Sequence, residues 1–196
     1  MRPLLLLLTL LALPLAAGCA SAQQSSATGP TLRADSVAVG ASGVMGTPVG
    51  PFTLYSLTEN RVVPNADSAS TAWDIGLRGT TVIVNGGTSG PGEGAAVLVG
   101  ADFETVTSAP EAPLVSDGAG DCGSREPLAV CTGSDNGWYT YGNSGVQPIP
   151  EQTLVVRRAD GDGLVKVRFL SYVLSEPLPD GSRPRYYAFE FAPLGQ

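Results

Sequence analysis

The 196-residue chain carries 11 Lys and Arg against 18 Asp and Glu, has a formal charge of −7 and contains no histidine. It has a single lysine, Lys166, and one adjacent arginine pair, Arg157 and Arg158, so it lacks the basic cluster that binds nucleic acid through phosphates. The absence of imidazole excludes Ser-His-Asp and Cys-His catalysis and removes the commonest metal ligand. We therefore expect neither an enzyme nor a metal centre.

The amino terminus has the pattern of a bacterial lipoprotein signal. Arg2 precedes an apolar run over residues 4–13, and the sequence Leu-Ala-Ala-Gly-Cys ends at Cys19. This order is typical of a cleaved leader and a lipidated thiol, and the run is shorter than the roughly 20 residues that span a bilayer. We predict a signal peptide over residues 1–18 and a mature chain that begins at lipidated Cys19. The alternative is a plain secretory peptide in which this cysteine is incidental.

The predicted leader also indicates where the protein works. Lipid chains on Cys19 would hold the mature protein at a membrane. No acidic residue precedes Asp35, so the sequence gives no strong signal for retention at the inner membrane. We expect an outer-membrane lipoprotein of the cell envelope, and the periplasmic and surface faces both stay open.

The rest of the chain divides into a tether and one domain. Residues 19–30 are small and polar, which predicts a flexible tether. Residues 31–196 contain short β-branched and aromatic runs, broken by Gly, Pro, Asn and Asp, without helical periodicity. We predict a single all-β domain of many short antiparallel strands with long loops. The clearest expected strands are Phe52–Leu57, Ala72–Leu77, Thr80–Val84, Ala95–Val99, Trp138–Tyr141, Thr153–Arg158, Leu164–Leu174 and Tyr186–Phe191.

The carboxy-terminal part predicts a three-stranded meander. An Asp-Gly-Asp-Gly turn over residues 160–163 supplies the positive φ of a tight reversal between the strands 153–158 and 164–174. The next turn contains Pro177 and Pro179, which have no N–H for a strand ladder, and leads into the last strand. These three strands should therefore pair in chain order.

Once Cys19 is lipidated, Cys122 and Cys131 are the two cysteines that remain. In an oxidising compartment we expect them to form a disulfide. The alternative is a metal site on the two thiolates, for which no histidine is present to complete the ligand set.

Two kinds of loop resemble parts of ligand sites. Residues 85–94 contain five glycines, but the residues that follow predict a strand and not the helix of a phosphate-binding loop. We interpret this segment as a long irregular hairpin loop. Asp160 with Asp162, and Asp117 with Asp121, resemble fragments of calcium loops that lack the closing Glu. We interpret both pairs as turn residues, with weak calcium binding as the alternative.

The sequence Trp138-Tyr139-Thr140-Tyr141 alternates aromatic rings on a strand that runs into a glycine-containing loop over residues 142–145. Rings in this arrangement either line a flat hydrophobic pocket or belong to the core. Both interpretations stay open from the sequence.

Several motifs follow one another in a characteristic order. They are Trp73-Asp74-Ile75-Gly76-Leu77-Arg78, Asn85-Gly86-Gly87-Thr88-Ser89-Gly90 with Gly92 and Gly94, Ala96-Val97, Val155-Val156-Arg157, Ala159-Asp160-Gly161, Val165-Lys166-Val167-Arg168-Phe169, Ser171-Tyr172 and Tyr187–Phe191. Together with the lipid-attachment sequence, this set resembles the HmuY family of bacterial haem-binding lipoproteins over roughly residues 50–192.

The resemblance implies an all-β fold with long loops around a haem cleft, and delivery of haem to a TonB-dependent outer-membrane receptor. Members of the family bind the iron through two axial His, or Met in some relatives, on loops that flank the Trp138 strand. In this chain Asn143 stands at the position of the second ligand, and Met45 lies upstream of both positions. Iron would then depend on Tyr139, Tyr141 or Met45, or haem would bind through its porphyrin face and its propionates alone.

Two functions follow from these observations. The first is haem binding at the cell envelope with unusual or absent axial ligation. The second is a binding or structural module of the envelope that recognises a protein or glycan partner without haem.

Overall fold

The computed structural model describes residues 29–40, 50–120, 122–125, 127–179 and 183–195. These ranges contain the strands β1 (Leu32–Val39), β2 (Thr53–Ser56), β3 (Arg61–Val63), β4 (Ile75–Arg78), β5 (Thr81–Val84), β6 (Ala95–Val99), β7 (Tyr139–Gly142), β8 (Gly145–Pro148), β9 (Thr153–Arg157), β10 (Leu164–Leu174) and β11 (Arg185–Leu194), and the short 3₁₀ helix η2 (Asn65–Asp67). The predicted leader, Cys19 and most of the predicted tether lie outside the described residues.

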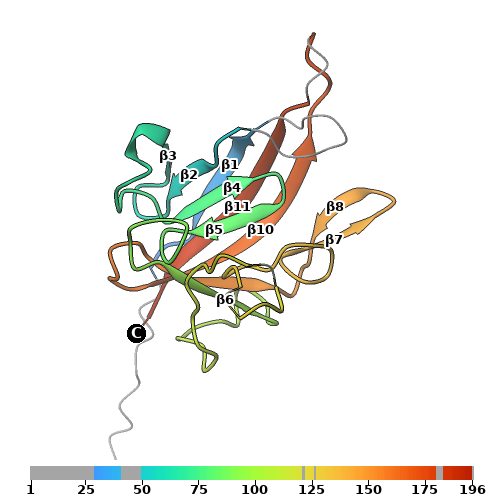
Figure 1. Cartoon of the computed structure of the whole chain (residues 1–196). Coiled ribbons are helices and arrows are strands. Elements are labelled where there is room, and N and C mark those ends of the chain that lie inside the picture. Colours follow the sequence, from blue (N-terminus) through green and yellow to red (C-terminus); the bar gives the residue numbers. More distant parts are fainter. Residues whose placement is uncertain (1–28, 41–49, 121, 126, 180–182, 196) are drawn as a thin grey trace, which may run out of the picture.

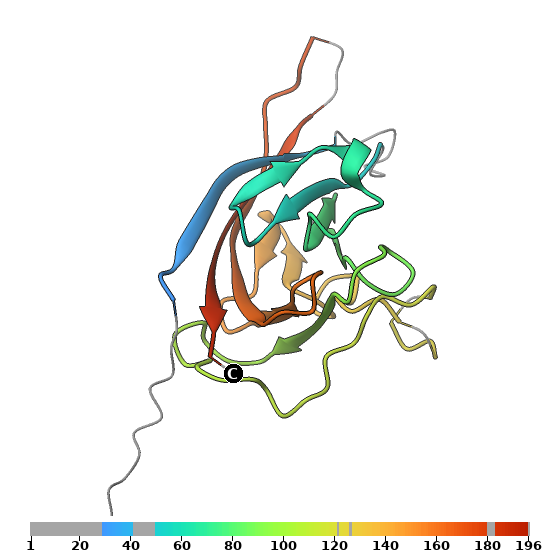
Figure 2. The ribbon, with the colours of Figure 1, turned by 90° about the vertical axis from the view of Figure 1, so that its left-hand side faces the viewer.

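Two antiparallel sheets face each other across the main core (Figures 1 and 2). One has the strand order β1-β11-β10-β9-β6 and the other β3-β2-β4-β5, while β7 and β8 form a separate hairpin. Tyr55 on β2 meets Phe189 on β11 edge-on, with ring centroids 5.0 Å apart. Side chains of both sheets therefore share one core, which is the arrangement of a β-sandwich.

Residues on β10 and β11 reach the core because side chains alternate between the two faces of a strand. The buried members of this alternation are Val165, Val167 and Phe169 on β10 and Tyr187, Phe189 and Phe191 on β11. The predicted all-β fold is confirmed, and the predicted meander is confirmed by the adjacent order β9-β10-β11.

Three strands were not expected from the sequence: β1, β3 and β8. β1 pairs with β11 through a register shift between Ala34 and Val37, where Ser36 has a positive φ of 57°. β8 pairs with β7 and turns the expected loop after Tyr141 into a hairpin. The hairpin matters for the site described below, because it projects its residues from the side of the sandwich (Figure 1).

The glycine-rich segment over residues 85–94 wraps around the buried side chain of Asn85. Its Nδ2 donates to the carbonyl oxygens of Ser70 and Trp73 at 2.8 Å each, and its Oδ1 accepts from the Gly92 N–H at 3.0 Å. The segment folds back on itself through an antiparallel bridge between Gly86 and Glu93, as expected of an irregular hairpin loop, but it joins β5 of one sheet to β6 of the other. Its glycines permit close backbone packing: a Cβ on Gly86 would overlap the carbonyl oxygen of Gly94.

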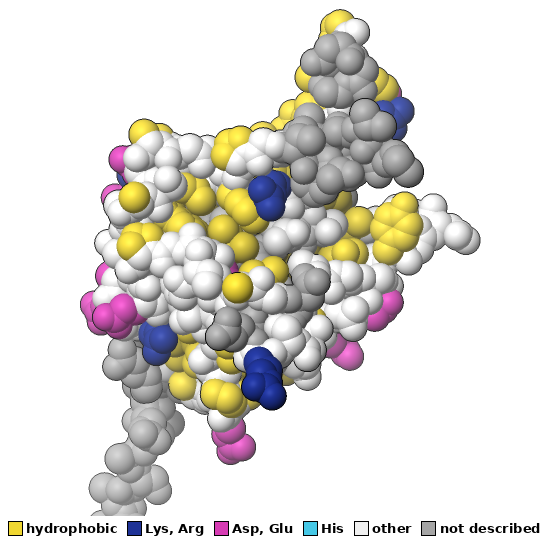
Figure 3. All heavy atoms as spheres, viewed as in Figure 1, with side chains coloured by type: hydrophobic (Ala, Val, Ile, Leu, Met, Phe, Trp, Pro, Cys, Tyr) yellow, Lys and Arg dark blue, Asp and Glu magenta, His cyan; other side chains and the backbone are white. Residues whose placement is uncertain are grey.

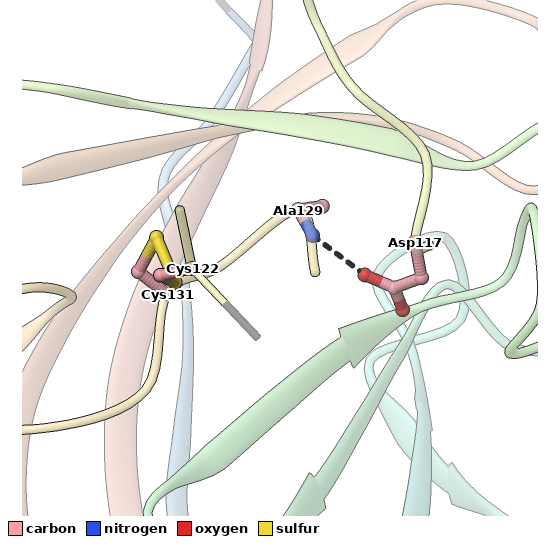
Figure 4. Close-up of a disulfide and its surroundings, with 4 residues drawn as sticks. All are labelled: Asp117, Cys122, Ala129 and Cys131. Carbon is pink, nitrogen blue, oxygen red and sulfur yellow. Dashed lines mark hydrogen bonds between the residues drawn. A yellow bond between two sulfur atoms is a disulfide. The ribbon is translucent and has the colours of Figure 1, made fainter. Parts of the chain in front are cut away.

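Asp117 fastens another long loop to the sandwich (Figure 4). Its two carboxylate oxygens accept the N–H groups of Val84 and Ala129, at 2.8 Å each. In the same loop Cys122 and Cys131 form the predicted disulfide, with their Cα atoms 5.3 Å apart. A buried carboxylate and a covalent link therefore hold the loop that precedes Trp138. Asp121, the other member of the predicted acidic pair, lies outside the described residues.

Asp74, which directly precedes β4, has a similar role and also accepts the Asn85 N–H through its backbone carbonyl at 3.0 Å. Its carboxylate accepts the N–H groups of Leu57 at 2.8 Å and Ala159 at 3.0 Å. Burial raises the pKa of Asp74 and of Asp117 above the usual range, against the opposite effect of these backbone hydrogen bonds.

Candidate functional site

Trp138, which directly precedes β7, belongs to the core. Its ring lies 4.6 Å from that of Phe169 and 5.2 Å from that of Tyr187, measured between centroids. Its Nε1 donates to the carbonyl oxygen of Thr80 at 2.9 Å. Of the two interpretations of the aromatic strand, the core interpretation therefore holds for this residue.

Tyr139 and Tyr141 both line a cavity of about 570 Å³. The other lining residues come from the β4–β5 turn, the β7–β8 hairpin and the adjoining ends of β10 and β11. They are Gly79, Thr80, Ser144, Gly145, Val146, Tyr172, Leu174 and Arg185. Figure 3 shows hydrophobic side chains exposed on the hairpin, at the right of the view. The pocket interpretation is thus consistent with the positions of these two tyrosines.

The two tyrosines differ in exposure. Tyr139 is only 7% exposed, and its phenol oxygen lies 3.3 Å from Oγ1 of Thr80, which donates to it. Tyr141 is 68% exposed. Tyr139 therefore forms part of the cavity wall, whereas the phenol of Tyr141 is free to contact a ligand.

The floor of the cavity is the β4–β5 turn, which two aromatic side chains hold in place. The first is Trp138, whose indole N–H donates to the Thr80 carbonyl oxygen. The second is Tyr187, whose phenol donates to the carbonyl oxygen of Gly79 at 2.7 Å. Both donors are buried in the main core. The position of the turn is therefore fixed from beneath by one buried and one partly buried hydrogen bond.

Among the described residues, Arg185 is the only charged one that lines the cavity. Its guanidinium lowers the pKa of Tyr172, but burial of this phenol has the larger effect and raises the pKa overall. Burial likewise raises the pKa of Tyr187, which lies behind the wall. Both phenols therefore stay protonated near neutral pH and can act as hydrogen-bond donors.

Of the two other predicted haem-pocket candidates, one lies apart from the cavity lining and one is outside the described residues. Asn143 lies exposed in the turn of the β7–β8 hairpin and is not among the lining residues, whereas its neighbours Ser144 and Gly145 are. Met45 lies outside the described residues, as does Cys19. Of the three candidates that the structure describes, Tyr139 and Tyr141 are the two that line one cavity.

The two carboxylates of the turn between β9 and β10 lie beside an arginine side chain. Asp160 and Asp162 both lie near the guanidinium of Arg158, with nitrogen–oxygen distances of 3.7 Å in each case. This arrangement favours the interpretation as turn residues. Within the described ranges there is no group of three or more His, Cys, Asp or Glu side chains that could hold a metal ion.

A second cavity of about 570 Å³ lies between β1 and the β2–β3 hairpin. Its polar groups already have partners: Nε of Arg33 lies 2.8 Å from Asp35, and the phenol of Tyr55 donates to Asn60 at 2.6 Å. This cavity lacks an exposed aromatic ring, so we place the candidate site at Tyr139 and Tyr141.

Sequence reasoning missed Thr80, Tyr172, Leu174 and Arg185 as members of this site. They lie on strands or turns far from Tyr139 in the chain, and no local motif marks them. The β10–β11 ladder, in which Leu174 pairs with Arg185, brings the last three to the same end of the sheet, and Thr80 joins them through its hydrogen bonds with Trp138 and Tyr139.

Comparison with known proteins leaves the sequence resemblance as a prediction. No protein-family model matches the chain, and no curated protein matches it in sequence. Among the described residues, no helix has the length and apolar character needed to cross a membrane.

Proposed function

We propose that this protein is an envelope lipoprotein that binds a flat, largely apolar ligand of the haem type in the cavity beside the β7–β8 hairpin. The observation that carries the proposal is the meeting of Tyr139 and Tyr141 in one cavity with Tyr172, Val146 and Leu174. Aromatic and aliphatic walls with few polar groups are typical of small-molecule sites.

The lining residues fit such a ligand in size and chemistry. The cavity volume of about 570 Å³ lies within the roughly 300–1,000 Å³ of small-molecule pockets. Burying the flat face of a porphyrin against these rings would contribute about 25 cal/mol per Å² of apolar surface, before the cost of association.

Iron coordination in this proposal would rest on a phenol or be absent. Tyrosine is a known haem ligand, and Tyr141 has the most exposed phenol of the cavity. Tyr139 is less suited, because its ring is buried and its oxygen is already bonded to Thr80. A phenolate ligand requires loss of a proton, so we expect coordination to strengthen with increasing pH.

The arrangement of termini and cavity supports presentation of the ligand away from the membrane. Leu32, near the start of the described chain, pairs with Phe191, whereas Arg185 at the other end of β11 lines the cavity. β11 has 10 residues, which corresponds to about 30 Å of strand. A lipid on Cys19 would therefore hold one end of the sandwich and leave the cavity open to a receptor.

The test is titration of the purified apo-protein with haemin. We expect a shifted Soret band, and we expect Tyr141→Phe to change its position if this phenol ligates the iron. Tyr186→Phe is the matched control, because Tyr186 is a partly exposed tyrosine on β11 that does not line the cavity. A spectrum identical to that of free haemin with an unrelated protein would contradict the proposal.

A second candidate function is recognition of a protein partner of the envelope without haem. It is favoured by exposed apolar side chains on and beyond the end of β10, namely Val173, Leu174 and Leu178. Recovery of the same envelope partner by the wild-type protein with and without haemin, and its loss when Val173 and Leu178 are both changed to Ser, would support this function.

A further inference from the structure

Arg185 is a cationic group in the wall of an otherwise uncharged cavity. Its side chain joins the three phenols of Tyr139, Tyr141 and Tyr172 and the apolar side chains of the lining. No Asp or Glu of the described ranges lines the cavity. The cavity therefore carries a positive charge, although the protein as a whole has a formal charge of −7.

The guanidinium also has an unused hydrogen-bond donor. Nη1 of Arg185 is buried and has no hydrogen-bond partner among the described residues. Among the described residues, no ion pair includes Arg185. Arg158 and Arg168, by contrast, each lie within 4.0 Å of carboxylates. A buried donor without an acceptor is unfavourable by about 1–3 kcal/mol, so such groups in native proteins usually mark a missing partner.

The groups that face Arg185 cannot neutralise it. The nearby titratable groups are the phenols of Tyr172 and Tyr187, whose pKa values burial raises. Both are neutral near pH 7. The phenol of Tyr172 lines the cavity and can donate its proton there, whereas the phenol of Tyr187 already donates to the Gly79 carbonyl. Among the described residues the cavity thus offers several donors, one charge and no carboxylate.

We infer that the ligand of this cavity is a planar aromatic carboxylate and that Arg185 is the residue that binds its carboxylate group. The inference rests on the proposed function and specifies the chemistry of the ligand. A neutral planar molecule of the same shape should bind more weakly than the carboxylate. A guanidinium group binds a carboxylate through two parallel N–H···O hydrogen bonds. An arginine without a carboxylate partner, beside aromatic rings, is suited to bind an aromatic carboxylate in this way. Tyr172 is placed to donate a further hydrogen bond to the same group.

The experiment compares acid and neutral forms of two planar ligands. The first pair is protoporphyrin IX and its dimethyl ester, and the second is pyrenebutyrate and pyrenebutanol, each followed by fluorescence titration. For the wild-type protein we expect the acid of at least one pair to bind roughly tenfold more tightly than its neutral form, which is about 1.4 kcal/mol.

The deciding variant is Arg185→Gln, which removes the charge and keeps a long polar side chain. We expect it to abolish the preference for the acid while binding the neutral form as the wild type does. Arg183→Gln is the matched control, because Arg183 is an exposed arginine two residues upstream that does not line the cavity, and it should retain the preference. Circular dichroism and thermal unfolding establish that both variants are folded.

The outcomes separate this inference from the proposed function. If the wild type binds porphyrins and Arg185→Gln keeps the preference for the acid, the assignment of Arg185 is wrong and haem-type binding stands. If porphyrins do not bind but pyrenebutyrate binds in an Arg185-dependent manner, the assignment stands and the haem-type ligand is wrong. If the wild type shows no preference for either acid, or binds no probe, the inference is overturned.

Discussion

Trp138 donates its indole N–H to the carbonyl oxygen of Thr80, 2.9 Å away, and so ties the start of β7 to the turn between β4 and β5. These residues are far apart in the sequence, yet the hydrogen bond sets the distance between two walls of the cavity. The indole ring itself packs against Phe169 and Tyr187 in the core. The shape of the cavity therefore depends on a residue that a ligand does not reach.

The first prediction concerns this residue. Trp138→Phe removes the hydrogen bond and part of the packed ring, so we expect the free energy of unfolding to fall by about 2–3 kcal/mol and pyrenebutyrate to bind more weakly. Trp73→Phe is the control, because Trp73 is also buried and donates to the Ser68 carbonyl at 3.0 Å, but lies in a separate core cluster. Urea denaturation and fluorescence titration measure both quantities. Equal losses of binding in the two variants would contradict the role of Trp138 in the cavity.

The second prediction concerns the buried carboxyl of Asp117. Burial raises its pKa above the ordinary aspartate value of 3.8, so just above that pH the native state holds a proton that the unfolded state has lost. The contribution of this group to stability is thus fully present below 3.8 and declines as the pH rises through the native pKa. Asp117→Asn does not titrate, and it replaces one of two acceptors with a donor that faces an N–H group.

We therefore expect Asp117→Asn to be less stable than the wild type, by an amount that decreases from pH 4 to pH 7. Urea midpoints across this range give the difference. Glu151→Gln, at an exposed acidic residue, should show no such trend. A stability difference that grew with pH would mean that the hydrogen bonds from Val84 and Ala129 outweigh burial and lower the pKa of Asp117.

The third prediction concerns the glycine-rich segment. A Cβ at Gly86 would overlap the backbone of Gly94, which cannot move without disturbing the hydrogen bonds of Asn85. We expect Gly86→Ala to lower the melting temperature strongly, with a loss of more than about 2 kcal/mol. Gly100→Ala is the matched control, since its Cβ meets no atom within 4 Å, and we expect it to be neutral or slightly stabilising. Similar melting temperatures for the two variants would contradict the close packing around Asn85.

The sequence was sufficient to predict those strands whose alternation is regular. Val165, Val167 and Phe169 follow a strict period of two, and the turns that flank β10 contain Asp-Gly or proline. β1 was missed because its bulge at Ser36 places the buried residues Ala34 and Val37 three positions apart. β8 was missed because it is short and ends in a proline. It forms a strand because it pairs with β7, and its own residues do not indicate this pairing.

The candidate site was only partly predictable for a related reason. Tyr139 and Tyr141 stand out because they are aromatic and alternate within one short segment. Arg185 and Tyr172 join them only through the register of the β10–β11 ladder, in which Leu174 pairs with Arg185 and Tyr172 with Tyr187. Register depends on the whole sheet and on the shift between Phe169 and Ser171, so no local pattern reveals it.

The fourth prediction concerns Lys166, the single lysine of the chain. Its Nζ is buried, donates to the carbonyl oxygens of Phe103 at 2.7 Å and Val106 at 3.0 Å, and lies 4.4 Å from the centre of the Phe103 ring. Burial lowers its pKa, which by itself would increase the fraction of reactive free amine. Because reagents cannot reach the amine without local opening of the loop over residues 103–106, we nevertheless expect slow modification.

The measurement is acylation of the native protein by an amine-reactive ester, followed by mass spectrometry of the peptide that contains Lys166. We expect its modification to be roughly tenfold or more slower in the native protein than in urea. Phe103→Ala removes the ring that covers the ammonium group and should accelerate the reaction without global unfolding. Fast modification of the native wild type would mean that the loop over residues 103–106 opens readily, and that the two carbonyl hydrogen bonds contribute little to holding it against β10.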